Sequence, residues 1–191
     1  LEKDRFDTLY LQTENNKLQE VLELDKTTAY STVGAKIMLD KNSPYLNSVI
    51  INKGSNVGIK LGMPVLSKGN LVGRIVEVNY ISSRILLLND LNSKIPAVIS
   101  PSGEQAILSG IGQKNPTLEY LPDGFQNVDN LTVYTSGKDG VLFPGISIGK
   151  IIRDEDDESD EDRIRVKLFS DPTQILYVNV VLDKSNDEEA K

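Results

Sequence analysis

Residues 65–76 read VLSKGNLVGRIV, and this stretch indicates the fold of the whole chain. Aliphatic and branched residues stand on both sides of Gly69, a pattern typical of two strands joined by a glycine turn. The second run contains Gly73, and a glycine inside a strand usually marks a bulge or a sharp bend. A small barrel needs such bends to close, so the stretch favours a curved, closed sheet.

The second half of the chain repeats this pattern. Residues 133–137 read VYTSG and residues 147–152 read SIGKII, so a strand, a glycine turn and a strand with an internal glycine follow each other again. Eight more residues separate the two elements in the second copy, which places an additional loop at Lys138–Pro144. Two related small barrels explain the repeat. Chance similarity between glycine-turn hairpins is the alternative.

Short runs rich in Val, Ile and Leu continue throughout the chain after residue 27, separated by Gly, Pro, Asn and Ser. We therefore predict an all-β fold of two small six-stranded β-barrel domains, preceded by an N-terminal α-helix. The predicted boundaries are 1–27 for the helix, 28–102 and 103–183 for the barrels, and 184–191 for a disordered tail. The predicted strands lie near residues 33–39, 48–52, 64–66, 71–78, 83–87, 95–99, 106–111, 117–121, 131–135, 147–153, 163–169 and 177–182.

The N-terminal segment has the composition of a helix, because residues 1–26 contain no Gly and no Pro and are rich in Leu, Glu, Lys and Gln. A seven-residue frame places Leu11, Asn15, Leu18 and Leu22 on one seam. An Asn at position a favours a parallel two-stranded coiled coil, since two such side chains hydrogen-bond to each other. We predict that the seam mediates dimerisation. The alternative is an amphipathic helix that packs on its own domain.

The composition excludes several kinds of chemistry. The 191 residues contain no His and no Cys, which removes a Ser-His-Asp triad, a Cys nucleophile and a thiolate zinc site. Eight of the 28 acidic residues lie in residues 154–162, and the other 20 nearly balance 21 basic residues, so nucleic-acid binding is not expected. The acidic run has Ser159 where a calcium-binding EF-hand loop needs Gly, which favours a solvated loop. No metal or cofactor is expected, and no apolar run is long enough to cross a bilayer.

Two rival functions remain open. A serine hydrolase would use Ser136 with Lys138 as its base, but residues 137–140 read as an exposed turn, whereas such a lysine must be buried. Asp40 and Asp90 follow strands and are better explained by turns than by a catalytic pair. A carbohydrate-binding module for the cell wall is the third candidate, weakened by the small number of aromatic residues.

A series of short motifs carries a family resemblance. The motifs are Glu14-Asn15-x-x-Leu18, Asn52-Lys53-Gly54, Gly58, Gly62-Met63-Pro64-Val65, Gly69-x-Leu71-Val72-Gly73-Arg74-Ile75, Ser82-Ser83, Leu86-Leu87, Asp90, Thr135-Ser136-Gly137, Phe143-Pro144-Gly145, Ile148-Gly149 and Tyr177-Val178-Asn179-Val180. In this order they resemble MreC, a family of bacterial rod shape-determining proteins, over essentially the whole chain. Residues 154–162 depart from the family pattern.

The resemblance implies a non-enzymatic scaffold of lateral peptidoglycan synthesis on the extracytoplasmic face of the cytoplasmic membrane. It implies an N-terminal membrane helix absent from this fragment, which begins at Leu1 and not at Met. The implied partners are a second copy of the chain, the class B penicillin-binding transpeptidase, MreD and, indirectly, the MreB system. Exposed strand edges are expected to assist self-assembly. The residues expected to form structural turns and bulges are Gly54, Gly62, Gly69, Gly73, Thr135, Ser136, Gly137, Pro144, Gly145 and Gly149.

Overall fold

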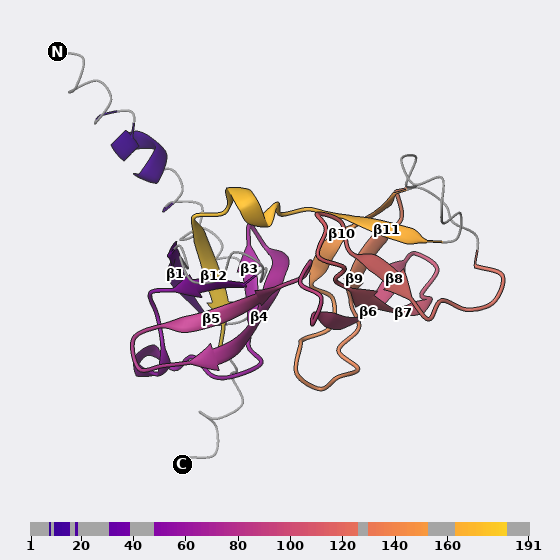
Figure 1. Ribbon diagram of the computed structural model, residues 1–191, viewed down its shortest axis with the longest axis horizontal. Coiled ribbons are helices and arrows are strands. Elements are labelled where there is room, and N and C mark those ends of the chain that lie inside the picture. The colour runs from indigo at the N-terminus through magenta and orange to yellow at the C-terminus, as the bar shows by residue number, and fades with distance from the viewer. Residues whose placement is uncertain are drawn as a thin grey trace.

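The chain is mostly β in the computed structural model, which describes Thr8, residues 10–15, Leu18 and residues 31–38, 48–125, 130–152 and 163–182 (Figure 1). Every range predicted as a strand overlaps one observed strand, which confirms the predicted strand positions. The elements are β1 (Thr32–Met38), β2 (Ser48–Ile51), η1 (Ser55–Val57), β3 (Pro64–Ser67), β4 (Asn70–Val78), β5 (Ser83–Leu87), β6 (Lys94–Ser100), β7 (Gln105–Ser109), β8 (Thr117–Glu119), β9 (Thr132–Thr135), β10 (Ser147–Ile152), β11 (Ile164–Leu168), η2 (Pro172–Gln174) and β12 (Tyr177–Val181).

Six of the strands form a closed barrel, which we call the first ring. They pair in the order β4-β3-β12-β1-β2-β5, and the pairing of β4 with β5 closes the ring. All of these pairs are antiparallel. The turn between β3 and β4 consists of Lys68 and Gly69, both with positive φ (51° and 80°), as a two-residue hairpin turn requires.

The other six strands extend this sheet and close on themselves, and we call them the second ring. They pair in the order β10-β9-β6-β7-β8-β11, and β10 also pairs with β11. The rings lie side by side (Figure 1) and meet where β10 runs parallel to β4, at Ser147 and Asn70. Because every described strand has a partner on both sides, the expectation of exposed strand edges was wrong.

Ring membership does not follow the order of the chain. Strand β6 lies before the predicted domain boundary at residue 102, yet it pairs with β7 and β9 in the second ring. Strand β12 comes last in the chain, yet it returns to the first ring between β1 and β3. The predicted ranges 28–102 and 103–183 therefore do not coincide with the grouping of the strands, because pairing between distant segments decides it.

Both rings contain a bulge beside the internal glycine of the repeat. The register shifts beside Gly73 in β4 and beside Gly149 in β10. A Cβ atom at Gly73 would lie 2.2 Å from the carbonyl oxygen of Leu86, and one at Gly149 would lie 2.3 Å from that of Lys167. In each ring a neighbouring strand thus approaches too closely for any side chain. The two rings therefore share a bulged strand with an internal glycine.

The hydrophobic interior continues from one ring to the other. One cluster of buried side chains fills the first ring, and a second cluster fills the second ring. The second cluster also includes Leu66, Leu71 and Val181, which belong to β3, β4 and β12 of the first ring. Apolar packing therefore fixes the position of one ring against the other.

The predicted N-terminal helix is confirmed only in part. Helical backbone is described at Thr8, residues 10–15 and Leu18, a short piece of the helix predicted over 1–27. In the described part of the chain, no helix combines the length and the apolar character that a bilayer crossing requires. The predicted features that lie outside the described residues are the rest of that helix with Leu22, Asp40, the acidic run 154–162 and the tail 184–191.

Candidate functional site

We call residues 135–146, which connect β9 to β10, the Thr135 loop. Thr135 is fully buried, and its hydrogen bonds hold the two ends of the loop together. Its hydroxyl donates a hydrogen bond to the carbonyl oxygen of Phe143 (2.6 Å) and accepts one from the N–H of Ile146 (2.9 Å). Its carbonyl oxygen accepts a third from the N–H of Gly145 (2.9 Å). One buried residue thus ties the end of the loop to its beginning.

The neighbours of Thr135 shape the base of the loop. Gly137 has a φ of +73°, and a Cβ atom there would lie 3.0 Å from Cδ of Pro144. The N–H of Ser136 donates to the carbonyl oxygen of Pro96 on β6 (3.0 Å), which fixes the loop to the sheet. The structure brings together five residues that the sequence analysis selected as turn residues: Thr135, Ser136, Gly137, Pro144 and Gly145.

The tip of the loop rests against the first ring. Asp139 stiffens it, because Oδ1 accepts hydrogen bonds from the N–H groups of Val141 and Leu142 (both 3.1 Å). A Cβ atom on Gly62, in the turn before β3, would lie 2.7 Å from Cγ1 of Val141. Leu142 is buried in the core of the second ring. The loop therefore belongs to the junction between the rings.

The other glycines that were expected to form turns and bulges lie outside the Thr135 loop. Gly69 and Gly73 belong to the β3–β4 hairpin, and Gly149 lies in β10. Gly54 packs under the β4–β5 turn, where a Cβ atom would lie 2.1 Å from the carbonyl oxygen of Asn79. These glycines therefore lie in turns and strands of the rings, away from the Thr135 loop.

The described side chains considered for a hydrolase accept hydrogen bonds from backbone N–H groups. The Ser136 hydroxyl accepts a hydrogen bond from the N–H of Lys138 (3.4 Å), within the turn. Asp90 is buried, and its Oδ1 accepts one from the N–H of Asn92 (2.8 Å), also within a turn. Among the described residues, no three Asp or Glu side chains gather into a group that could hold a metal ion.

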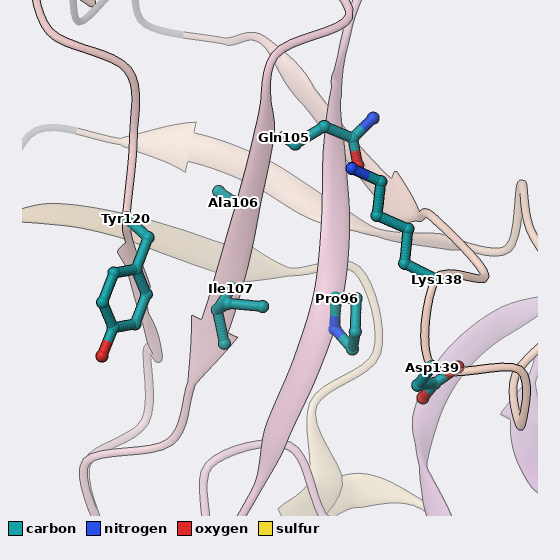
Figure 2. Close-up of a pocket in the computed structure, with 7 residues that line it drawn as sticks. All are labelled: Pro96, Gln105, Ala106, Ile107, Tyr120, Lys138 and Asp139. Carbon is teal, nitrogen blue, oxygen red and sulfur yellow. The ribbon is translucent and has the colours of Figure 1, made fainter.

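A pocket of about 250 Å³ opens beside the Thr135 loop (Figure 2). No local sequence pattern singled out Tyr120, which is 82% exposed and has a φ of +60°, an unusual conformation for a bulky residue. Lys138 and Asp139 bring the tip of the loop into the pocket wall. The lining consists of Pro96, Gln105, Ala106, Ile107, Tyr120, Lys138 and Asp139.

Glu14 connects the N-terminal helical segment to the first ring. The hydroxyl of Tyr177 on β12 donates a hydrogen bond to Oε1 of Glu14 (2.5 Å), and Nζ of Lys36 on β1 lies 3.8 Å from the same oxygen. The hydrogen bond, together with burial and the carboxylate charge, raises the pKa of Tyr177 to about 12. This contact could not be predicted from the sequence, because a helix–strand contact across 163 positions has no local signal.

The predicted dimer seam is exposed where the structure describes it. Leu11 and Leu18 are 61% and 42% exposed, and Asn15 is exposed as well. Glu14, on the same segment, contacts the first ring through its carboxylate. The leucines remain accessible in that position.

Comparison with known proteins gives one consistent result. The family model described as "Rod shape-determining protein MreC, barrel core" matches residues 37–182. The cell shape-determining protein MreC of Caulobacter vibrioides is 37% identical over 178 residues, which cover 92% of this chain and 49% of that protein. The MreC of Cereibacter sphaeroides is 32% identical over 175 residues. The chain thus spans about half the length of these relatives.

Solved structures share the fold. A structure of MreC superimposes with a TM-score of 0.78 at 24% identity, covering 90% of this chain and 99% of that chain. The major periplasmic domain from the cell shape-determining filament MreC gives 0.67 at 19% identity and covers 80% of this chain. A complex between the penicillin-binding protein PBP2 and MreC from Helicobacter pylori gives 0.60 at 14% identity and again covers 80% of this chain.

Replacing the Thr135 hydroxyl should destabilise the protein strongly. Thr135→Val keeps the shape but removes the hydrogen bonds of the hydroxyl to the Phe143 carbonyl and to the Ile146 N–H, which should lower the free energy of unfolding by about 2–4 kcal/mol. Thr135→Ser keeps the hydroxyl and should cost about 1 kcal/mol. Urea unfolding followed by circular dichroism measures both. Equal losses in the two variants would contradict the role of the hydroxyl.

The Glu14–Tyr177 contact predicts one late-titrating tyrosine. Because the folded-state pKa is raised, the hydrogen bond contributes fully below pH 10 and is lost as the pH rises through about 12. Glu14→Gln should shift the last step of the tyrosinate absorbance at 295 nm to lower pH, and Tyr177→Phe should remove it. Tyr80→Phe, a change on the β4–β5 turn, should leave that step in place. A late step that survives Tyr177→Phe would refute the assignment.

Proposed function

The chain belongs to the MreC family of rod shape-determining proteins, and from this membership we propose that it is a scaffold of the machinery that extends the lateral cell wall. The family is one of shape-determining proteins and not of enzymes. The observation that carries the proposal is the family match over residues 37–182, a range that includes strands of both rings.

The geometry suits a scaffold because the two rings form one stiff body. The shared apolar core, the Thr135 loop and the β4–β10 pair all join them. A second link is polar: Ser147 Oγ donates to Asn70 Oδ1 (2.6 Å), and Ser170 Oγ donates to the carbonyl oxygen of Ser67 (3.1 Å). We propose that each ring is a barrel domain, the first made of β1–β5 with β12 and the second of β6–β11. Partners bound to the two rings would be held at a fixed separation.

We propose self-association through the N-terminal helix. The exposure of Leu11, Asn15 and Leu18 supports it, since a seam buried against its own ring could not pair. Leu22 would extend the seam by one turn. Because the rings close on themselves, pairing through the helix does not compete with any strand contact.

Solved structures of relatives support a proposal for the partners and the location. A solved complex contains PBP2 and a Helicobacter pylori MreC, and another structure is that of a periplasmic MreC domain. For this chain we propose a class B penicillin-binding transpeptidase as the direct partner, with MreD, and with the MreB system engaged indirectly. We propose that it works on the extracytoplasmic face of the cytoplasmic membrane, anchored through a preceding helix as the family resemblance implies.

A single charge on the seam should abolish self-association. Leu18→Asp should convert a dimer to a monomer in equilibrium sedimentation and leave the β circular dichroism unchanged, because a carboxylate in the seam would be buried without a partner. Leu91→Asp, at a residue 68% exposed in the turn before β6, is the matched control and should stay dimeric. An unchanged mass for Leu18→Asp would count against the seam.

Crosslinking in cells should identify the partner. A photoreactive residue placed singly at exposed positions of both rings, such as Tyr80 and Phe169, should capture a class B penicillin-binding transpeptidase from at least one position. The same residue at Ile85, which is fully buried, should capture nothing. Capture of cytoplasmic proteins alone would overturn both the partner and the location.

A further inference from the structure

The pocket beside the Thr135 loop has features that a scaffold of rigid rings does not require. We propose that it binds a sugar ring carrying a carboxylate, as a sugar-acid unit of a glycan would present it, and that Tyr120, Lys138 and Asp139 make the contacts. This binding is separate from the proposed contact with a transpeptidase. It would give the second ring a ligand of its own.

Tyr120 provides a stacking surface, and its backbone is strained. Its left-handed conformation costs about 1–2 kcal/mol for a residue other than glycine. Within the described residues no hydrogen bond to Tyr120 compensates for this, and the residue is 82% exposed. Figure 2 shows the ring standing beside Ile107 at the side of the pocket. An exposed aromatic face is suited to the apolar C–H face of a pyranose ring.

The floor of the pocket is apolar and rigid. Pro96 and Ile107 are opposite partners in the β6–β7 pair, so both are fixed by the sheet. The volume of about 250 Å³ is below the roughly 300–1,000 Å³ of pockets for drug-sized ligands. A single ring with short substituents therefore fits better than an extended peptide segment.

The polar groups stand at different places around this floor. Figure 2 shows Lys138 extending toward Gln105, whereas Asp139 lies nearer Pro96. Among the described residues Lys138 forms no ion pair, so its ammonium group is available to a carboxylate. Oδ1 of Asp139 already accepts two backbone hydrogen bonds, which leaves Oδ2 for a hydroxyl donor.

These groups together match one kind of molecule. A sugar acid has an apolar ring face for Tyr120, a carboxylate for Lys138 and hydroxyl groups for Asp139 and Gln105. An apolar side chain of a protein partner would use the floor and leave the charged groups without partners. The pocket is already formed, because the Thr135 hydroxyl holds the loop and both strands are paired, so binding requires little ordering.

Nuclear magnetic resonance titration of the whole chain tests the proposal with a matched pair of ligands. N-acetylmuramic acid carries the carboxylate, and N-acetylglucosamine has the same ring without it. We expect amide shifts confined to residues 105–107, 120 and 136–140, with at least fivefold tighter binding of the acid. Shifts elsewhere, no shifts, or equal affinity for both sugars would overturn the proposal.

Two variants separate the contribution of Tyr120 stacking to sugar binding from that of the Lys138 charge. Tyr120→Gly relieves the strain at positive φ, so it should fold at least as stably while binding of both sugars falls at least tenfold. Lys138→Met keeps the apolar stem and should lower the affinity for the acid to that of N-acetylglucosamine. Tyr80→Ala, which removes a tyrosine 73% exposed in the first ring, should change neither affinity.

Two further outcomes would contradict the proposal. If acetate alone reproduces the shifts of the sugar acid, the site recognises only a charge. If an acidic peptide saturates the pocket and neither sugar binds, the pocket is a docking site for a protein. The crosslinking experiment does not depend on these results, so a failure here would leave the proposed scaffold function standing.

Discussion

The structure depends on one constraint: the backbone N–H and C=O groups of every strand need partners. The twelve strands that the structure describes satisfy it by closing into two rings, and neither closure follows the order of the chain. Strand β12 must return to the first ring to fill the place between β1 and β3, and β6 pairs with β7 and β9 and not with the preceding strand β5. The bulges at Gly73 and Gly149 supply the curvature that both closures require.

Local features of the fold could be predicted from the sequence, and long-range ones could not. Branched residues between Gly, Pro and Asn located all the observed strands, and the Gly69 turn and the two bulge glycines were recognisable because their causes are local. The return of β12 to the first ring depends on pairing across most of the chain, and the place of β6 depends on its pairing with β9, neither of which a short window reveals. The expectation of free strand edges failed for the same reason.

The candidate site shows the same division. The Thr-Ser-Gly and Pro-Gly motifs were visible in the sequence, but the clamp formed by the buried Thr135 hydroxyl requires knowledge of the folded loop. Tyr120 was not distinguishable from the other tyrosines, since its positive φ and its place in the same pocket lining as Lys138, across β7 and β6, appear only in the folded sheet. The Thr135 loop thus contributes both to the junction of the rings and to the pocket wall.

The return of β12 to the first ring also determines how the molecule would respond to tension. Strands β1 and β12 are antiparallel, and the N–H of Leu182 donates to the carbonyl oxygen of Ser31 (2.8 Å), so the chain enters and leaves the first ring at adjacent points. A force pulling these points apart would open the β1–β12 ladder one bond at a time, like a zipper. The second ring lies outside that line of force and would keep its shape until the first ring had begun to open.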